Sequence, residues 1–369
     1  MHRLQLKTAY SPLQFAGIRI LLGGYLLYYF LQLLPHREEL FSSLGMVPDV
    51  TVNTTYGISF WFISYFTSPG AISLLFFVLI ATSILFSVGI LRQVTALLLW
   101  VGWLILYNLN NLTIDPSLGF TGLLLLVFAT VPSGEPLVLG RRFLLSTPAW
   151  RMPTITYWGI WFVFGLAFTM SGLEKFSSLI WTSGSALGYF FSGPVGLSNQ
   201  LVDWVITWPT FLHQLITWIV LYSQLLAMGM ILFRKTRIIL WLVLTGLFIG
   251  AIGFLDLFEV LLGMLIFYLF LVEATWFQPK GTVTVWIDET CKICQYFAKV
   301  IKNEDLNGKI VFYSYRDATL QKYLSATEIE EMKEIIAHDG KRLYRGSDAV
   351  LRTCTQLGGL WTVFYIGYL

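Results

Sequence analysis

The chain has 369 residues, of which 56% are hydrophobic and only 12% are charged, with a mean hydropathy of +0.70 and a net charge of +3. Soluble domains carry about 25% charged residues, so this composition excludes a typical soluble protein. Residues 281–369 hold 11 basic and 11 acidic residues, whereas the first 280 residues hold only 13 and 10. No basic stripe offers a surface for a phosphate backbone, so we expect no nucleic acid partner. The chain therefore divides into an apolar part, residues 1–279, and a tail of globular composition, residues 280–369.

Apolar stretches that approach the length of a membrane span recur through the first part of the chain. They predict a polytopic α-helical membrane bundle of about eight spans, of which the fourth and seventh are short for a span of about 20 residues. Gly246 and Gly250 form a G-x-x-x-G pattern on the seventh span, which predicts close helix packing. The predicted spans lie near residues 13–34, 70–91, 93–110, 117–132, 153–173, 211–233, 237–253 and 255–275.

The basic residues of the short loops predict the orientation of this bundle. With eight spans and a cytoplasmic N-terminus, nine Lys or Arg residues fall in the inside loops and only Arg37 and Lys175 in the outside loops. Positively charged loops stay on the cytoplasmic side during insertion. We therefore expect an integral protein of the inner or plasma membrane whose N-terminus and tail are both cytoplasmic. A count of seven or nine spans would reverse the side of the tail.

Two polar groups belong to the predicted outer face. Asn108, Asn110 and Asn111 follow the third span, and Lys175 ends the fifth, shortly before Trp181. A lysine at the edge of a span can extend its charge into the headgroups, or it can be partly desolvated and become a neutral amine that serves as a base. Trp181 is also typical of an aromatic belt at a membrane interface.

The sequence S-G-L-E-K-F at residues 171–176, followed by W-T-S-G at 181–184, resembles the HTTM family, the membrane domain related to vitamin K-dependent gamma-glutamyl carboxylase. In the carboxylase the matching lysine deprotonates vitamin K hydroquinone, so the resemblance implies Lys175 as a catalytic base. It also implies a non-covalent quinone, hydroquinone or other lipid ligand, for which Asn108, Asn110, Asn111 and Trp181 are the candidate binding residues. The carboxylase's large lumenal domain is absent, so we do not expect carboxylation of protein glutamate.

The tail has the pattern of a small α/β domain. Residues 282–287 and 309–315 predict strands, and residues 291–302 predict a helix between them with Ile293, Phe297, Val300 and Ile301 on one face. Helical stretches follow around 317–323 and 327–336, then a hairpin at Asp339-Gly340 and a helix over 347–357. This is the element order of a thioredoxin-like domain.

All three cysteines lie in the tail. Cys291 and Cys294 form a C-x-x-C motif that follows a strand and opens a helix, where unpaired N–H groups and the helix dipole favour the thiolate. Such a motif predicts a redox pair, and the alternative is two thiols that merely pack in the core. Cys354 has no partner in the sequence and is expected to be a buried hydrophobe. No second Cys or His pair completes a zinc site, so no metal is expected.

Three motifs of the tail, W-I-D-E-T-C-K-I-C at 286–294, Y-R-G-S-D-A at 344–349 and L-G-G-L-W at 357–361, resemble the DCC family of thiol–disulfide oxidoreductases. The resemblance implies that Cys291 attacks, that Cys294 resolves, and that Asp288 forms the turn and accepts the proton of the inner thiol. A cytoplasmic thiol reductant is the implied partner.

Together these features predict an integral membrane redox protein, in which a carboxylase-like bundle that binds a quinone-type or lipid ligand is joined to a cytoplasmic thiol–disulfide oxidoreductase. Lys175 and Cys291 are then separated by a hydrocarbon core of about 30 Å, so no direct electron transfer between them is expected. The alternative is a non-enzymatic transport, export or immunity component whose tail senses the redox state.

Overall fold

The computed structural model of the chain describes residues 10–53, 66–113, 115–140, 144–147, 150–331 and 334–368. The chain forms two compact units. The bundle unit consists of Arg19–Val131 and Pro153–Leu271, and the tail unit consists of Met1–Ile18, Pro132–Met152 and Val272–Leu369. Part of the predicted outer segment 35–69, including Trp61, lies outside the described residues, as do Arg141 and Arg142 of one inner loop.

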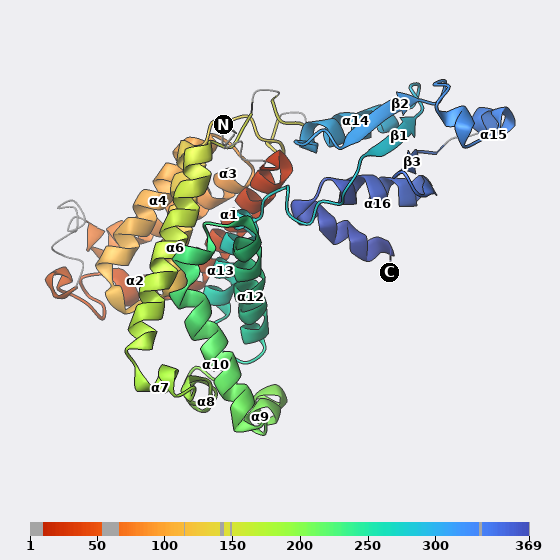
Figure 1. Cartoon of the computed structure of the whole chain (residues 1–369). Coiled ribbons are helices and arrows are strands. Elements are labelled where there is room, and N and C mark those ends of the chain that lie inside the picture. Colours follow the sequence, from red (N-terminus) through yellow and green to blue (C-terminus); the bar gives the residue numbers. More distant parts are fainter. Residues whose placement is uncertain are drawn as a thin grey trace, which may run out of the picture. The chain divides into compact units, whose positions relative to one another are not determined.

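Helices make up the bundle unit, and Figure 1 shows the long ones running alongside one another. Each apolar stretch found in the sequence is occupied by a helix, and the first of these, α1, begins in the tail unit and belongs to the bundle unit from Arg19 onward. The helices in chain order are α1 (Pro12–Leu33), α2 (Arg37–Phe41), α3 (Pro69–Ser87), α4 (Arg92–Leu109), α5 (Pro116–Thr130), α6 (Thr154–Phe176), α7 (Leu179–Thr182), α8 (Ala186–Ser192), α9 (Gln200–Ile206), α10 (Thr210–Leu225), α11 (Ala227–Met230), α12 (Arg234–Ile252) and α13 (Phe258–Leu271).

The number of helices that can cross a membrane is smaller than predicted. Among the described residues, five helices are long and apolar enough, or six if α9 and α10, which meet at a bend of 104°, count as one span. The five are the stretch of α1 and α2, then α3, α4, α6 and α12. The apolar helices α5 and α13 have 15 and 14 residues, fewer than the roughly 20 that a bilayer requires. A membrane protein with several apolar helices is therefore supported, and a count of eight spans is not.

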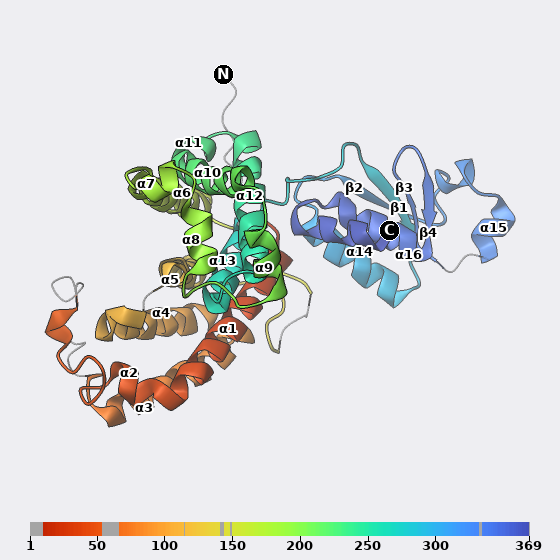
Figure 2. The same ribbon diagram turned by 90° about the horizontal axis from the view of Figure 1, so that it is seen from below.

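Aromatic side chains fill the centre of the bundle unit. The ring of Phe120 on α5 lies 4.7 Å from that of Phe267 on α13, and the Phe164 ring on α6 lies 5.8 Å from Phe267. Trp161, one turn before Phe164, is fully buried. Figure 2 shows α5 and α13 between α1, α3 and α4 on one side and α6, α10 and α12 on the other. These rings therefore join α6 to the central helices α5 and α13.

The predicted packing of the G-x-x-x-G face on α12 is wrong. A Cβ atom added at Gly246 or at Gly250 would meet no atom of the described residues within 4 Å. Close approach occurs instead at Gly172 on α6, where an added Cβ would lie 2.4 Å from the backbone nitrogen of Leu225. The spacing of two glycines does not say which helix face meets a neighbour, and here it is α6 that approaches α10.

The tail unit is built on a mixed four-stranded sheet of order β2-β1-β3-β4. β1 pairs in parallel with β2, with Val283 opposite Ile310, whereas β3 runs antiparallel to both β1 and β4. The elements follow the predicted order of strand, helix, strand, helix, hairpin and helix. They are β1 (Val283–Ile287), α14 (Lys292–Glu304), β2 (Ile310–Ser314), α15 (Ala326–Glu331), β3 (Ile336–His338), β4 (Leu343–Arg345) and α16 (Gly346–Gln356).

The two faces of this sheet are buried by different segments. Alternate residues of β1, Val283, Val285 and Ile287, pack on one side with residues of both α14 and α16, and Figure 2 shows these two helices beside the strands. Trp286 points to the other face and packs with Leu320 and nearby residues. β1 is therefore buried on both faces, as its continuous apolar run indicates.

The structure corrects one residue of the predicted buried face of α14. Val300 and Ile301 are buried as predicted and Phe297 packs against the core, whereas Ile293 is 81% exposed. The buried residues of the helix are Cys294, Ala298, Val300, Ile301 and Glu304. The helix begins after Cys291, and the spacing of three and four residues from Cys294 onward defines the stripe that faces the sheet. Ile293 precedes this stripe by one position, which turns its side chain toward solvent.

A buried carboxylate ends α14. Glu304 is 2% exposed, and its oxygens accept hydrogen bonds from the Ser11 hydroxyl and, at 3.0 Å, from the backbone N–H of Leu13. Ser11 and Leu13 stand at the start of α1, where the first N–H groups lack partners within the helix. Burial raises the pKa of Glu304 to about 7, against the opposing effect of the hydrogen bond from Ser11. Glu304 therefore caps α1 within the tail unit.

Candidate functional site

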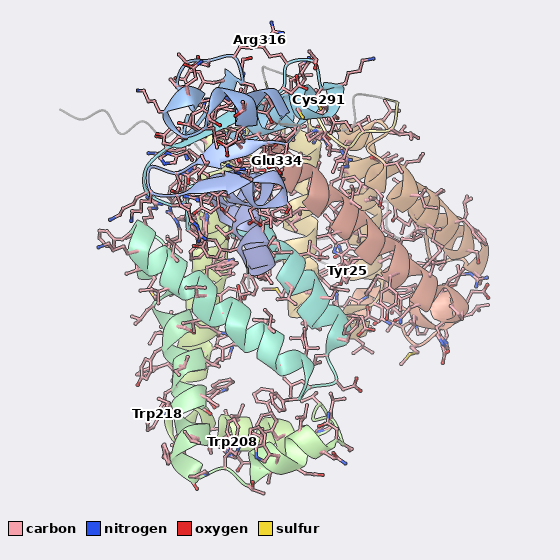
Figure 3. The ribbon with its side chains drawn as sticks, turned by 90° about the vertical axis from the view of Figure 1, so that its right-hand side faces the viewer. Tyr25, Trp208, Trp218, Cys291, Arg316 and Glu334 are labelled. Atoms are coloured by element: carbon pink, nitrogen blue, oxygen red, sulfur yellow. The ribbon has the colours of Figure 1, made fainter. Side chains whose placement is uncertain are left out.

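The C-x-x-C motif lies at the carboxyl end of β1. Four residues, 288–291, connect β1 to α14. The carboxylate of Asp288 closes this turn by accepting hydrogen bonds from Thr290, at 2.8 Å from its N–H and 2.7 Å from its hydroxyl. The backbone N–H of Cys291 donates to the Asp288 carbonyl oxygen at 3.3 Å. The turn therefore places Cys291 at the N-cap of α14, directly before its first residue Lys292 (Figure 3).

The two thiols are in direct contact and are free. The Cys294 thiol donates a hydrogen bond to the Cys291 sulfur at 2.7 Å, and the Cys294 N–H donates to the same sulfur at 3.2 Å. Cys291 thus caps the helix with its side chain. Cys291 is half-buried, while Cys294 is only 9% exposed. An incoming sulfur would reach Cys291 first.

These contacts shift the two thiol pKa values in opposite directions. Hydrogen bonds from the thiol and the N–H of Cys294 lower the pKa of Cys291. Burial, together with the hydrogen bond donated to Cys291, raises the pKa of Cys294 to about 11. The thiolate is the nucleophile in thiol chemistry. These shifts favour the thiolate on Cys291 and the protonated thiol on Cys294.

Asp288 lies beside the pair, and the contacts of its carboxylate are those of a turn former. The hydrogen bonds from Thr290 lower its pKa. A role as proton acceptor for Cys294 stays a prediction, because the described contacts include no hydrogen bond between the two side chains.

Cys354 takes no part in the site. It lies on α16 in the core cluster that also contains Cys294 and Ala298, and it is 6% exposed. Burial raises its pKa to about 12. It behaves as a buried hydrophobe.

The sequence did not single out Tyr315, which directly follows β2. Its backbone N–H donates to the carbonyl oxygen of Ile287 at 3.2 Å, which fixes it at the same sheet edge as the thiols. Its hydroxyl oxygen is buried and has no hydrogen-bond partner among the described residues. Burial raises the pKa of Tyr315, and the nearby thiols and Asp288 raise it further. The carboxyl ends of parallel strands lie at one edge of a sheet, and that rule could have found this residue.

A second unforeseen contribution comes from the start of β3. Ile335 packs against the core cluster that includes both cysteines of the motif. Its carbonyl oxygen accepts a hydrogen bond from the N–H of Gly346 at 2.9 Å. Glu334 precedes it and is exposed (Figure 3). The antiparallel pairing of β3 with β1, which the sequence did not specify, brings this segment to the thiols.

Lys175 and Trp181 come together in the bundle unit. The Lys175 ammonium donates to the Ser171 hydroxyl at 2.7 Å and lies 5.2 Å from the centroid of the Trp181 ring. Trp181 also packs against Phe190. Lysine and tryptophan thus form a cation–π pair where α6 ends. Whether either residue contacts a ligand stays a prediction.

The asparagines in the last turn of α4 and directly after it hold neighbouring backbone. Asn110 is fully buried, and its amide nitrogen donates to the Leu40 carbonyl oxygen at 2.8 Å. Asn108 donates to the Leu104 carbonyl oxygen at 2.8 Å, and Asn111 to that of Tyr107 at 3.0 Å. These contacts are structural, and binding of a ligand by the three asparagines stays untested. The described residues contain no group of three or more His, Cys, Asp or Glu side chains that could hold a metal ion.

Comparison with known proteins agrees with the geometry of the thiol site. Residues 285–368 match the family of DCC1-like thiol-disulfide oxidoreductases, which confirms the predicted similarity of the tail. No family match supports the predicted HTTM domain. No curated protein and no solved structure matches the chain.

Proposed function

We propose that the tail unit is a thioredoxin-like thiol–disulfide oxidoreductase carried by a membrane protein, with Cys291 as nucleophile and Cys294 as resolving thiol. The observation that carries the proposal is the contact at the start of α14, where the Cys291 sulfur accepts hydrogen bonds from both the thiol and the N–H of Cys294. A pair that only packed in the core would not leave one sulfur half-exposed as a helix cap.

The reaction is two successive thiol–disulfide exchanges. The Cys291 thiolate attacks one sulfur of a substrate disulfide, so that a mixed disulfide forms and the other substrate sulfur leaves as a thiolate. The Cys294 sulfur then attacks Cys291, its proton passes to the departing sulfur, and the second substrate thiol is released. Two electrons have moved to the substrate, and Cys291 and Cys294 are joined. A cytoplasmic thiol reductant then reduces the Cys291–Cys294 disulfide and restores the two thiols.

The surface beside the thiols suits an apolar part of a substrate. Ile293, between the two cysteines, is 81% exposed, and Tyr296, one turn further, is 37% exposed. An apolar side chain this exposed next to a reactive sulfur adds contact area for the substrate that carries the disulfide.

Trapping with oxidised glutathione tests the thiol chemistry. Cys294→Ser should accumulate a glutathione adduct on Cys291, since nothing resolves it, whereas the native chain should pass to the internal disulfide. Cys291→Ser should form neither product, and Cys354→Ser, which removes only a buried thiol, should match the native chain. Intact mass and peptide mapping of the full chain measure the products. Unreactive Cys291 in the native chain would refute the proposal.

For the bundle unit we propose a quinone-type or other lipid-soluble ligand at the end of α6, with Lys175 as the group that faces it. The pairing of Lys175 with Ser171 and Trp181 supports this, because it holds an amine and an aromatic face together. Mass spectrometry of lipids retained after purification tests it. Near one menaquinone or ubiquinone per native chain, reduced in Lys175→Ala, supports the proposal, and phospholipid alone contradicts it.

We further propose that the N-terminus and the tail are both cytoplasmic, which requires an even number of spans, such as the six obtained when α9 and α10 form one span. The basic residues of the predicted inside loops support this orientation. Single cysteines placed in loop 234–237 and in loop 35–69, in a chain whose native cysteines are replaced by serine, should differ in labelling by an impermeant maleimide applied to intact cells. Labelling only in 35–69 is expected. Labelling only in 234–237 would reverse the orientation and would place the thiols in an oxidising compartment, where they could not be kept reduced.

A further inference from the structure

The bundle unit contains an open apolar groove between α6 and the segment that joins α11 to α12. The groove has a volume of about 400 Å³, within the range of small-molecule sites. Trp158, Gly159 and Phe162 of α6 form one wall, and Met228, Ile231 and Leu232 form the other. The lining is apolar, so the groove offers nothing to a polar, water-soluble ligand.

The residues at the rim of this groove show what surrounds it. Ile155 is 84% exposed, Phe162 52% and Leu232 68%. α6 is one of the helices long and apolar enough to cross a membrane. Large exposed apolar side chains on such a helix face the hydrocarbon of the bilayer. The groove is therefore open to lipid along its length.

Positive charge lies at one end of the groove. Arg234 and Lys235, in the first turn of α12, are both exposed and follow Leu232 of the lining after a single residue. Arg237, in the same turn, is 4% exposed, and its guanidinium carbon lies 4.5 Å from the centroid of the Trp158 ring. Cations at the first turn of a helix are unfavourable for the helix itself, since they repel its positive end. An anion bound there would offset that cost.

We propose that this groove binds a bilayer phospholipid with an anionic headgroup, whose acyl chain lies between α6 and the α11–α12 segment and whose phosphate lies beside Arg234 and Lys235. The apolar lining and the terminal charges are complementary to the two parts of one such molecule. Basic pockets between membrane helices recognise anionic lipid headgroups in this way. The site is separate from the thiol chemistry and lies within the bundle unit.

Two substitutions test the two halves of the site. Gly159→Leu would fill the groove, and an added Cβ there meets no described atom within 4 Å, so the helix should accept it. Gly246→Leu is the matched control, since Gly246 is also an exposed helical glycine, on α12, where an added Cβ likewise meets no described atom within 4 Å. Lys235→Gln removes one charge at the end of the groove, and Lys322→Gln, an exposed lysine of the tail unit, is its control.

Native mass spectrometry of the full chain, titrated with phosphatidylglycerol and with phosphatidylcholine of the same acyl chains, gives the readout. We expect one phosphatidylglycerol to bind more tightly than phosphatidylcholine. Lys235→Gln should weaken the binding of phosphatidylglycerol by about fivefold and leave that of phosphatidylcholine unchanged, since a basic residue near an anionic lipid contributes about 1 kcal/mol. Gly159→Leu should weaken the binding of both lipids, and the two controls should bind both lipids as the native chain does.

Equal affinity of the native chain for the two lipids would overturn the proposal. So would a Gly159→Leu variant indistinguishable from Gly246→Leu, because the groove would then not be the place where the lipid binds. A loss in Gly159→Leu without any loss in Lys235→Gln would overturn the assignment of the headgroup.

Discussion

Replacing Glu304 by glutamine should remove a pH dependence from the junction of α14 and the start of α1. The glutamine oxygen can still accept the Leu13 N–H, and the Ser11 hydroxyl can rotate to accept from the new amide. Glu304→Gln therefore keeps the shape of the contact and removes only the titration.

The magnitude follows from the pKa of Glu304, about 7 in the folded chain against 4.5 when it is exposed. Between these two pH values the folded state holds a proton that the unfolded state releases, so the free energy of opening falls as the pH rises. A difference of 2.5 between the two pKa values lowers the free energy of opening by about 3 kcal/mol. This loss is reached at about pH 7 and stays constant above it. Glu304→Gln should show no such loss of stability, because glutamine does not titrate.

Hydrogen exchange of the full chain measures this local stability at peptide resolution. After correction for the chemical exchange rate, protection of residues 11–18 should fall roughly hundredfold between pH 5 and pH 8 in the native chain and stay constant in Glu304→Gln. Glu289→Gln, an exposed carboxylate of the same unit, should behave as the native chain. An equal fall in Glu304→Gln, or a rise in the native chain, would refute the reasoning.

Three further outcomes are expected. Iodoacetamide at pH 7 should modify Cys291 much faster than Cys354, because the pKa of Cys291 is lowered and that of Cys354 is raised to about 12 by burial; equal rates by peptide mass spectrometry would contradict this. Asp339→Asn should destabilise the β3–β4 hairpin by about 2 kcal/mol at pH 7, because backbone N–H groups and Arg352 hold the pKa of Asp339 at about 2 despite its burial. In the native chain, hydrogen exchange should show that ionised Asp339 stabilises the hairpin above about pH 4 and that this stabilisation is lost as the pH falls through 2. Tyr315→Phe should raise the thermal midpoint of the reduced chain, because a buried hydroxyl without a partner costs about 1 kcal/mol or more; a lower midpoint would mean that the hydroxyl has a partner.

The position of the two thiols could be predicted from the sequence, for a local reason. Cys291 and Cys294 are three residues apart on one helix turn, and the strand before them and the helix after them are both strong patterns. Tyr315 is not part of this local pattern, and finding it requires the rule that parallel strands end at one edge of a sheet, together with the register of β2 against β1. Ile335 depends likewise on the pairing of β3 with β1. Contacts between distant segments are set by packing, which a local pattern does not contain.

The membrane part was harder to predict for a different reason. Hydropathy finds apolar helices, and each predicted span is occupied by one. It does not distinguish a helix that spans from one that is buried in the bundle, such as the 14-residue α13. Gly246 and Gly250 show the same limit, because a pattern on one helix does not specify the neighbour that it meets.

The capping of α1 by Glu304 also has a consequence for the biosynthesis of the chain. Ser11 and Glu304 are 293 positions apart. At a synthesis rate of about 5–20 residues per second, Glu304 is synthesised roughly 15–60 s after the first turn of α1 that it caps. A tail expressed alone would carry Glu304 without the groups that bind it. The first and last parts of the chain therefore complete their folding together, after translation has passed through the whole bundle.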